Sequence, residues 1–363
     1  MSDRQPGPPD GDAAGILAEL AASGTLTELY GKEPTGRLDP LLLRRILREA
    51  DARGPQGTVL ALLVQLATAT PLLADAADSP ATTEILRGAL DGTRLLALAA
   101  TDAASAGSDL AALGTTVDLP DSGNDGDLVL DGGKRWVTSA LTAGHALVLA
   151  RHRPGRHFTS FTWVLVPLTA PGVTVRPADT ELFLGAGLGH LDFRSVRLPR
   201  AYVLGRPGRG LAHFARHMAV ERLASAAWAV ELCRRVVADT AHRLTTRTVD
   251  GTPLRQSPSV RQRLAGCAVR VSALDALWNQ SADPVATRYD ATAAATLKAL
   301  SGMTVEHVLT ECGHLQGADG FARDGVQRLR AEAAVFGIGG GTTELVLDTV
   351  AERLDQVLGG RTR

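Results

Sequence analysis

The chain has 363 residues, of which 45% are hydrophobic and 21% are charged, and its formal net charge is −1. This balance is typical of a globular protein, and without a cluster of Lys or Arg it gives no reason to expect a nucleic-acid partner. No apolar run reaches the roughly 18 to 20 residues that a membrane span needs, and the N-terminus lacks the apolar core of a secretory signal. We therefore expect a cytoplasmic protein without a membrane partner.

The first quarter of the chain is predicted to be helical. Residues 1–11 are typical of a disordered lead-in. Residues 12–96 are expected to form an N-terminal helical domain, because apolar residues recur three and four apart. Within it, the stretch 57–76 is apolar nearly all round, which predicts a buried helix that stops near Pro71.

Residues 97–206 are predicted to form a central β domain. Val and Thr become frequent there, and short apolar runs are separated by Gly, Pro and charged turns, which favours a compact barrel or sandwich. In the stretch DLVLDGGKRWVTSA, residues 127–140, the pair Asp131-Gly132 predicts the turn of a hairpin.

Long helices are predicted for residues 207–363. One unbroken helical pattern of about 35 residues begins near Gly210, two more cover 258–282 and 284–315, and the last begins near Gly341. Long consecutive helices predict an antiparallel bundle, and their Ala-rich faces suggest subunit contacts. Strands and helices do not alternate as βαβ units, so we do not expect a dinucleotide-binding Rossmann domain.

The three cysteines of the chain carry no sign of a metal site. Cys233, Cys267 and Cys312 are widely spaced and form no metal-binding pattern. We expect reduced, buried thiols and no bound metal.

Four motifs follow one another along the chain. They are LLALAATDAASAGSDLAALGTT (95–116), DGGKRWVTSA (131–140), HMAVERLASAA (217–227) and HLQGADGF with GIGGGTTEL (314–345). Together with the order of helices, strands and helices, they resemble the acyl-CoA dehydrogenase family. The resemblance covers roughly residues 55–358. It implies an α+β fold with an N-terminal helical domain, a central β-barrel and a C-terminal four-helix bundle, and FAD bound between barrel and bundle.

The first motif is similar to the family's TEPxAGSD loop. The resemblance implies that Thr101 and Ser108 donate hydrogen bonds to the flavin and that Gly107 allows its close approach. The part before AGSD is one residue longer than in the family and lacks the proline.

The second motif, KRWVTSA, is similar to the family's KxWITN. It implies that Trp136 covers one face of the flavin and that Thr138 forms a hydrogen bond near N5, with Val137 between them as a further cofactor contact. A flat apolar ring stacks well on the isoalloxazine, and a nearby hydroxyl tunes its reduction potential.

The dinucleotide half of the cofactor is expected to contact the bundle. Arg247 matches an Arg that pairs with the FAD pyrophosphate of a partner subunit, whereas Asp250 stands where the family has an aromatic residue. In HLQGADGF, similar to QxxGGxGF, Gly317 is kept and His314 replaces a cofactor-binding Gln. Thr342 and Glu344 match the rest of the cofactor motif near the C-terminus and complete the expected cofactor contacts.

The expected catalytic base has moved from its common place. GIGGGTTEL resembles the family's IYEGTSEIQ, whose Glu takes the α-proton of the acyl thioester in many members, but here Gly340 stands at that position. Isovaleryl-CoA and long-chain acyl-CoA dehydrogenases also have a Gly there and carry the base on the first long bundle helix, in a Glu-Arg pair. Because this chain has Glu221-Arg222 at that place, we expect Glu221 to be the base. Arg222, Gly340, Gly341 and Ser108 are then expected to contact the substrate.

The resemblance also implies the partners. The substrate would be an acyl thioester of CoA or of acyl carrier protein, the product an enoyl thioester, and the electron acceptor an electron-transferring flavoprotein or a similar protein. A homodimer or homotetramer is expected. A pocket wall reduced to glycines suggests an unusual acyl chain, and with it a role in specialised metabolism.

Two other interpretations remain open. A flavin-dependent monooxygenase or oxidase on the same fold would also lack the loop Glu and would often have a weakened adenine site, as Asp250 and His314 suggest. A catalytically silent member of the family would act as a binding or assembly protein.

Overall fold

The structure, a computed structural model, describes residues 12–102, 109, 112–120, 126–323 and 325–359. It divides into two compact units. The first contains the chain up to Leu43 together with Arg53–Met218, and the second contains Arg44–Ala52 together with Ala219–Arg363. The expected lead-in, residues 1–11, lies outside the described residues.

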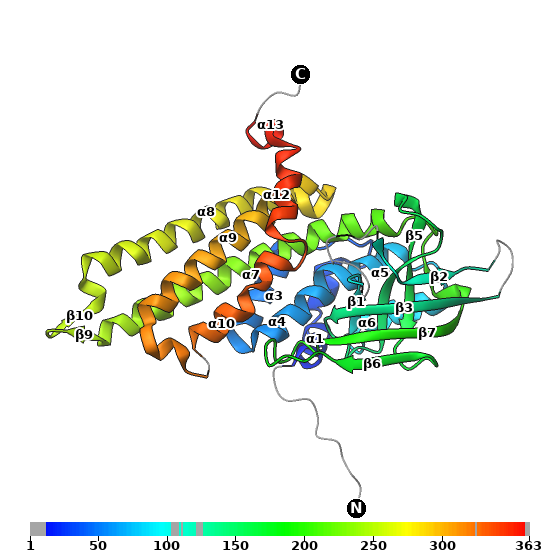
Figure 1. The fold of residues 1–363 in the computed structure, drawn as a ribbon, viewed down its shortest axis with the longest axis horizontal. Helices are drawn as coiled ribbons and strands as arrows, with labels where there is room; N and C mark the ends of the chain where they lie inside the picture. The colour runs from blue at the N-terminus through cyan, green and yellow to red at the C-terminus, as the bar shows by residue number, and fades with distance from the viewer. Residues whose placement is uncertain (1–11, 103–108, 110–111, 121–125, 324, 360–363) are drawn as a thin grey trace, which may run out of the picture. The chain divides into compact units, whose positions relative to one another are not determined.

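Helices fill the N-terminal region, as predicted (Figure 1). Ser79 begins α6 with a capping box, in which its hydroxyl accepts from the Thr82 N–H while the Thr82 side chain accepts from the Ser79 N–H. The helices are α1 (Ala13–Ala22), α2 (Thr25–Tyr30), α3 (Pro40–Arg53), α4 (Gln56–Val64), the π-helix η1 (Gln65–Ala69), α5 (Thr70–Ala76) and α6 (Pro80–Leu90).

The prediction that the apolar helix stops near Pro71 is wrong. The Thr70 N–H donates to the Gln65 carbonyl, five residues back, in a π-helical turn. The next bond of this register would run from residue 71 to the Leu66 carbonyl, but proline has no N–H to donate. The Tyr30 hydroxyl donates to the Leu66 oxygen instead, at 2.9 Å. The wider turn and this substitute donor let the helix continue past the proline.

The expectation that no apolar run reaches the length of a membrane span is wrong for the resulting stretch Gln56–Ala76, which has 21 residues. By length and composition it meets the requirement for a membrane span. However, 89% of its apolar window is buried inside the protein, as expected for a core helix.

The strands form one eight-stranded sheet with the order β6-β7-β3-β2-β4-β5-β8, and β1 pairs with β4 in parallel. Short 3₁₀ turns at Phe158–Ser160 and Arg200–Tyr202 precede β5 and β8. The strands are β1 (Leu96–Ala99), β2 (Thr116–Asp118), β3 (Asp127–Val137), β4 (His145–Arg151), β5 (Phe161–Pro167), β6 (Val173–Pro177), β7 (Gly189–Pro199) and β8 (Val203–Leu204).

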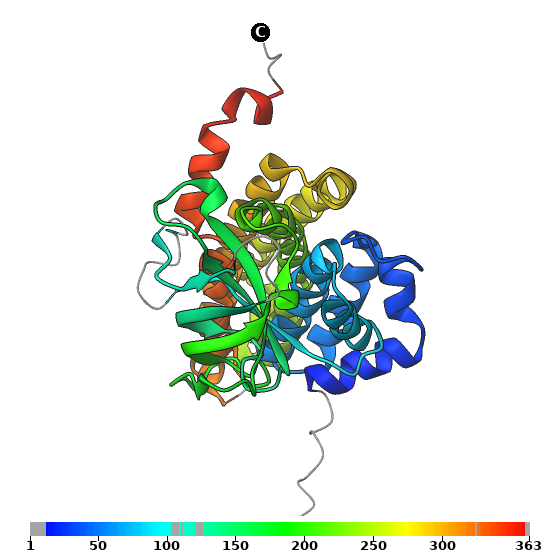
Figure 2. The ribbon, with the colours of Figure 1, turned by 90° about the vertical axis from the view of Figure 1, so that its right-hand side faces the viewer.

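Both faces of the central strands are buried, which explains why these strands are continuous apolar runs. Successive side chains of a strand point to opposite faces. In β4, Val148 joins one core cluster with residues of β3 and β7, while the neighbouring Leu147 and Leu149 join another. The second cluster includes Leu72 of α5 and Ile85 of α6, so these helices cover that face of the sheet (Figure 2).

The predicted hairpin turn at Asp131-Gly132 is also wrong. β3 runs through both residues and pairs with β7, with a register shift between Leu130 and Gly132. Gly132 has φ 129°, and a Cβ there would lie 2.6 Å from the Thr115 Cα. The glycine therefore serves a bulge and a close backbone approach, not a turn.

The second unit is a bundle of long helices, to which α7 contributes from Ala219 onward. The prediction of one unbroken helix from Gly210 is confirmed by α7, which spans 37 residues. The elements are α7 (Gly210–Thr246), β9 (Thr248–Val249), β10 (Thr252–Pro253), a 3₁₀ turn (Leu254–Gln256), α8 (Pro258–Arg288), α9 (Ala291–Gln316), a 3₁₀ turn (Gly317–Phe321), α10 (Val326–Ala333), α11 (Val335–Ile338), α12 (Thr343–Ala351) and α13 (Leu354–Val357).

The break between α8 and α9 lies later than predicted. Pro284 is inside α8, and the helix ends at Tyr289, which takes a left-handed φ of 55°. Asp290 then caps α9 by accepting from the N–H groups of Thr292 and Ala293. The local capping chemistry, more than the proline, decides where the helix ends.

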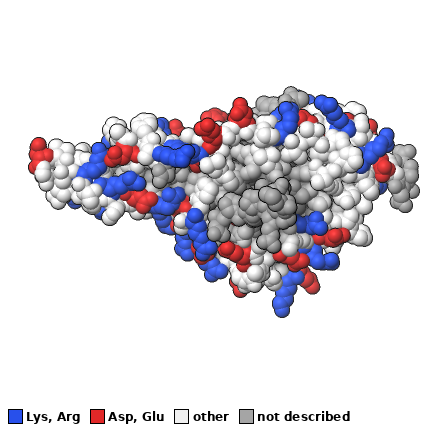
Figure 3. Space-filling model, turned by 90° about the horizontal axis from the view of Figure 1, so that it is seen from below, with Lys and Arg blue, Asp and Glu red and all other residues white. Residues whose placement is uncertain are grey.

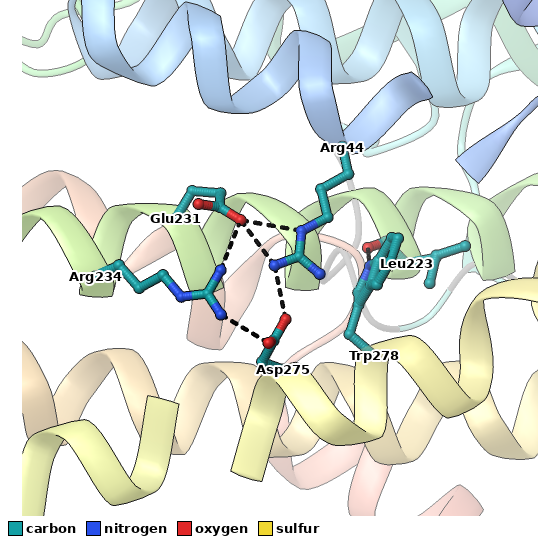
Figure 4. A network of polar contacts seen from close by, with 6 residues as sticks. All are labelled: Arg44, Leu223, Glu231, Arg234, Asp275 and Trp278. Atoms are coloured by element: carbon teal, nitrogen blue, oxygen red, sulfur yellow. Dashed lines mark hydrogen bonds and ion pairs between the residues drawn. The ribbon is translucent and has the colours of Figure 1, made fainter. Parts of the chain in front are cut away.

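A partly buried polar network ties the α3 segment of the second unit to α7 and α8 (Figure 4). Arg44 contacts Glu231 at 2.8 Å and Asp275 at 2.7 Å, and Arg234 joins the same two carboxylates. The Arg44 guanidinium also lies 4.6 Å from the Trp278 ring centroid. Because both carboxylates have cationic partners, the network tolerates burial and fixes how the helices meet.

Charged side chains of both signs are interspersed on the face of the molecule seen in Figure 3. This arrangement agrees with the near-zero net charge of the chain.

Candidate active site

The glycine-rich segment after α11 has a backbone that side chains rarely adopt. Gly340 has φ 74° and Gly341 has φ 104°, both in the left-handed range. Gly339 has an ordinary φ of −66°. Gly340 stands where many family members carry the loop Glu. Its left-handed backbone disfavours any side chain at that position.

Arg222 holds this segment. Its Nε donates to the Gly340 carbonyl at 2.9 Å, and a Cβ on Gly341 would lie 3.1 Å from its Nη2. Burial lowers the pKa of Arg222, and the charge of Glu221 opposes that effect. The structure thus brings together the predicted substrate residues Arg222, Gly340 and Gly341, although 118 residues separate the first two in sequence.

Glu221, the predicted base, is half-buried on α7. Its charge acts on Arg222 beside it and on Lys298 of α9. Lys298 is only 1% exposed, and its ammonium donates to the carbonyl of Phe336 in α11. Burial lowers the pKa of Lys298 to about 8, with Glu221 opposing the shift and Arg222 adding to it. Arg222 and Lys298 thus each hold a carbonyl of the α11–glycine region, and the charge of Glu221 acts on both cations.

In the first unit, a bulge turns Trp136 outward. Trp136 has φ 53° and is 58% exposed, whereas the Val137 side chain is buried in the core of the sheet. The Trp136 N–H donates to His190 Nδ1 at 3.1 Å, and the two rings meet edge to face with centroids 5.5 Å apart. Thr138 is half-buried, and the buried Ser139 hydroxyl has no hydrogen-bond partner within the described residues.

A buried ion pair anchors the start of the first motif loop. Lys134 Nζ lies 3.3 Å from Asp102 Oδ2 and donates to the Ala100 carbonyl, and both side chains are almost fully buried. Asp102 also accepts from the N–H and hydroxyl of Thr115. Thr101 is half-buried, and its carbonyl accepts from the Arg135 N–H, next to Trp136.

Gly107 and Ser108 lie outside the described residues.

The bundle brings two of the predicted dinucleotide contacts together. Arg247 Nη1 donates to the Gln316 carbonyl at 2.7 Å, and its terminal nitrogens lie 3.7–3.8 Å from where a Gly317 Cβ would be. Its side chain is 41% exposed and lies 3.6 Å from the carboxylate of Asp319. His314 is exposed on the last turn of α9.

Thr342 and Glu344 flank the start of α12. Thr342 is the N-cap, whose side chain accepts from the Leu345 N–H. Glu344 is exposed in the first turn of the helix, where the macrodipole favours an acidic group.

Several residues of this arrangement were missed from the sequence. His190 and Lys298 lay outside the quoted motifs, whereas Asp102 and Lys134 lay inside two of them without being assigned a role. One signal was present: the chain has only three lysines among 38 basic residues, and Lys298 sits in an apolar helical stretch. An isolated lysine in such a stretch is costly to bury without a purpose.

The comparisons with known proteins agree with this architecture. Family models match residues 97–196 as an acyl-CoA dehydrogenase middle domain and residues 208–355 as an acyl-CoA dehydrogenase C-terminal domain. An acyl-[acyl-carrier-protein] dehydrogenase MbtN of Mycobacterium sp. (strain MCS) is 29% identical over 276 residues, which cover 74% of this chain and 68% of that protein.

The fold is shared with solved structures. An acyl-CoA dehydrogenase from Geobacillus kaustophilus superposes with a TM-score of 0.85 at 20% identity, covering 94% of this chain and 90% of that one. An FAD complex of PigA superposes with a TM-score of 0.81 at 18% identity, covering 94% of both chains. With the two family models matched in order over the sheet and the bundle, the chain belongs to the acyl-CoA dehydrogenase family.

Proposed function

We propose that this chain is an FAD-dependent acyl-thioester dehydrogenase in which Glu221 takes the α-proton of the substrate. The product is the corresponding enoyl thioester. The observation that carries the proposal is the pairing of two features in the bundle. The loop position of the common base is a glycine with a left-handed backbone, and a carboxylate stands on α7 next to Arg222, which holds the carbonyl of that same glycine.

The surroundings of Glu221 suit a base. On the same face of α7, three and four positions further on, Ala224 is buried and Ser225 is half-buried, so this face is poor in water. The charges of Arg222 and Lys298 favour its ionised form, which is the form that accepts a proton. Arg222 also fixes the Gly340 carbonyl, so the backbone beside the base is held in place.

The residues of the first unit fit a flavin. The exposed Trp136 ring is held by His190 and by a bulge, which presents a flat apolar surface to a planar ligand. The buried Ser139 hydroxyl, left without a partner within the described residues, supplies a polar group next to Thr138. When bound, FAD supplies the acceptor for the β-hydrogen of the substrate, which leaves as a hydride.

The dinucleotide half fits less completely. Arg247 is partly exposed beside Gly317, in keeping with a pyrophosphate contact. However, the Asp319 carboxylate lies close to the same guanidinium. A bound pyrophosphate would have to compete with this carboxylate, so we expect Arg247 to turn away from it on binding.

The finer features of the proposal rest on the family. The thioester carrier is either CoA or acyl carrier protein, and the name of the MbtN relative favours the carrier protein. We also propose a homo-oligomer, an electron-transferring flavoprotein or similar acceptor, and a role in specialised metabolism. The division into helical, β and bundle domains at residues 12–96, 97–206 and 207–363 belongs to the same proposal.

The test is anaerobic bleaching of the FAD-loaded protein by a panel of acyl-CoA and acyl-carrier-protein thioesters. We expect at least one thioester to bleach the flavin absorbance and to be released as an enoyl thioester. Glu221→Gln should bind FAD normally and slow bleaching by roughly a thousandfold or more, since the base is removed. Bleaching at the unaltered rate in Glu221→Gln would remove Glu221 from this role.

A matched control separates the base from general damage. Glu306→Gln changes an exposed glutamate on α9 and should leave the rate unchanged. Oxygen consumption with reduced flavin and no bleaching by any thioester would support the oxidase interpretation instead.

A further inference from the structure

The edge of the eight-stranded sheet carries a hollow that the proposed function does not use. It has a volume of 540 Å³, which is within the range of binding sites for small molecules. The residues that line it come from β3, β6 and β7, three neighbouring strands of the first unit (Figure 1): Gly132, Thr174, Arg176, Asp192, Phe193 and Arg194.

The register of the strands gathers polar side chains on one face of this sheet edge. Leu191 packs into the core of the sheet, so the next side chain, that of Asp192, points to the opposite face. Thr174 of β6 and Gly133 of β3 lie directly across from Asp192 on its two sides. Arg176 follows two positions after Thr174 and therefore lies on the same face. Three strands thus contribute to one polar surface.

The Asp192 carboxylate holds two guanidinium groups on this surface. Its Oδ2 accepts from Arg176 Nε at 2.9 Å and from Arg176 Nη2 at 2.5 Å, and its Oδ1 accepts from Arg135 Nη1 at 3.2 Å. Burial opposes the ionisation of Asp192, but the hydrogen bonds from the two arginines keep its pKa below the usual value. Because a guanidinium has five N–H groups, Arg176 keeps donors for a further acceptor.

Gly133 leaves the space beside this ion pair open. A Cβ at Gly133 would lie 3.0 Å from Asp192 Oδ1 and 3.4 Å from Arg135 Nη1, so a larger side chain would press on both groups. Glycine weakens the interior of a strand, and it often marks a place that a ligand or another backbone approaches closely.

The charges around the hollow do not cancel. Three arginines, Arg135, Arg176 and Arg194, and one aspartate, Asp192, leave a formal charge of +2. Asp131 is also near, and its carboxylate accepts from the backbone N–H that follows Arg194. The balance stays positive when Asp131 is counted. The hollow therefore favours an anion with more than one charge.

We propose that this hollow binds the phosphate monoester of a small molecule. Such a group carries about −1.5 to −2 charges at neutral pH and three strong acceptor oxygens. The side chains of Arg176 and Arg194 supply planar sets of donors that suit these oxygens, and Thr174 adds a hydroxyl. A phosphate diester has a single charge and complements the hollow less well. This site does not depend on Glu221 or on thioester chemistry.

The experiment measures binding to the FAD-loaded protein by isothermal titration calorimetry, at neutral pH and about 0.1 M salt. Bound FAD keeps nucleotides out of the cofactor site. The probes are inorganic phosphate, adenosine 5′-monophosphate and glucose 6-phosphate, which distinguish the bare anion, a nucleotide and a sugar phosphate as the source of the phosphate group. Cyclic adenosine monophosphate, a diester of the same nucleoside, is the matched control ligand.

We expect at least one monoester to bind, with inorganic phosphate competing for the same site. If the ligand is a nucleotide, adenosine 5′-monophosphate should bind at least about tenfold more tightly than its cyclic diester; if it is a sugar phosphate, glucose 6-phosphate should bind where glucose does not. Arg176→Gln and Arg194→Gln should each weaken binding at least about tenfold, because each removes a charged donor to the phosphate.

Arg197→Gln is the matched control variant. Arg197 is an exposed arginine on β7 that does not line the hollow, so its replacement should change the affinity by less than about twofold. If Arg176→Gln does not fold, Arg194→Gln still tests the contact, since it leaves the bonds of Asp192 in place. Unchanged binding in Arg194→Gln, or no binding of any phosphate probe at millimolar concentration, would overturn the proposal and leave the proposed function standing.

Discussion

The buried pair of Lys134 and Asp102 provides a sharp test of how the first motif loop is anchored. The two side chains are 0% and 1% exposed, and their charged atoms lie 3.3 Å apart. Replacing Lys134 by Met keeps the side-chain length and removes the charge. The Asp102 carboxylate then stays buried and keeps its bonds from the N–H and hydroxyl of Thr115.

The magnitude follows from these contacts. Breaking a buried ion pair by removing one partner costs about 3 to 5 kcal/mol, because the other charge is left uncompensated. The two Thr115 bonds remain, so we expect the lower end, about 3 kcal/mol. For a unit of this size, that loss lowers the melting temperature by roughly 6 to 12 °C.

The assay is thermal unfolding of the purified protein at pH 7, followed by far-UV circular dichroism. Lys32→Met, at an exposed lysine, is the control and should change the melting temperature by less than about 2 °C. The double variant Asp102→Asn/Lys134→Met removes both charges and should recover most of the loss. A single Lys134→Met variant as stable as Lys32→Met would refute the idea that this pair anchors the loop.

Three further predictions concern the second unit and the π-helical turn. In urea unfolding, Gly340→Ala should destabilise by about 1 kcal/mol because of its left-handed φ. Gly339→Ala, at an ordinary φ, should cost less, because its Cβ would only press on the Val335 methyl group 3.2 Å away. Tyr30→Phe should lower the free energy of unfolding by about 1 to 3 kcal/mol, since the buried Leu66 carbonyl loses its donor; an unchanged urea midpoint would contradict this account of the turn. Burial lowers the pKa of Lys298 to about 8, so the folded chain releases this proton at a lower pH than the unfolded chain does. The free energy of unfolding of the wild type should therefore rise from pH 7 to pH 9.5 by about 2 kcal/mol relative to Lys298→Met, and parallel curves for the two proteins would exclude a buried charged lysine.

The sequence by itself determined the order of the elements and the family. Helical periodicity predicted the long α7, and short apolar runs separated by turn residues predicted the β region. Four motifs in a fixed order indicated the fold. These features are local, because each depends only on the spacing of residues within one short stretch of the chain. Residues that are distant in sequence do not affect them. The same locality explains the errors at Pro71 and at Asp131-Gly132, where a distant hydroxyl and a paired strand overrode a correct local preference.

Only the tertiary structure decided which groups act on one another. Glu221 and Arg222 were visible in the sequence, but Lys298 is more than 70 positions away and reaches them only because α7 and α9 share a bundle. Likewise, His190 supports Trp136 only through the pairing of β3 with β7. Electrostatic and hydrogen-bond contacts depend on the distance between two groups in space. Packing sets that distance, and the spacing of the two residues along the chain does not predict it.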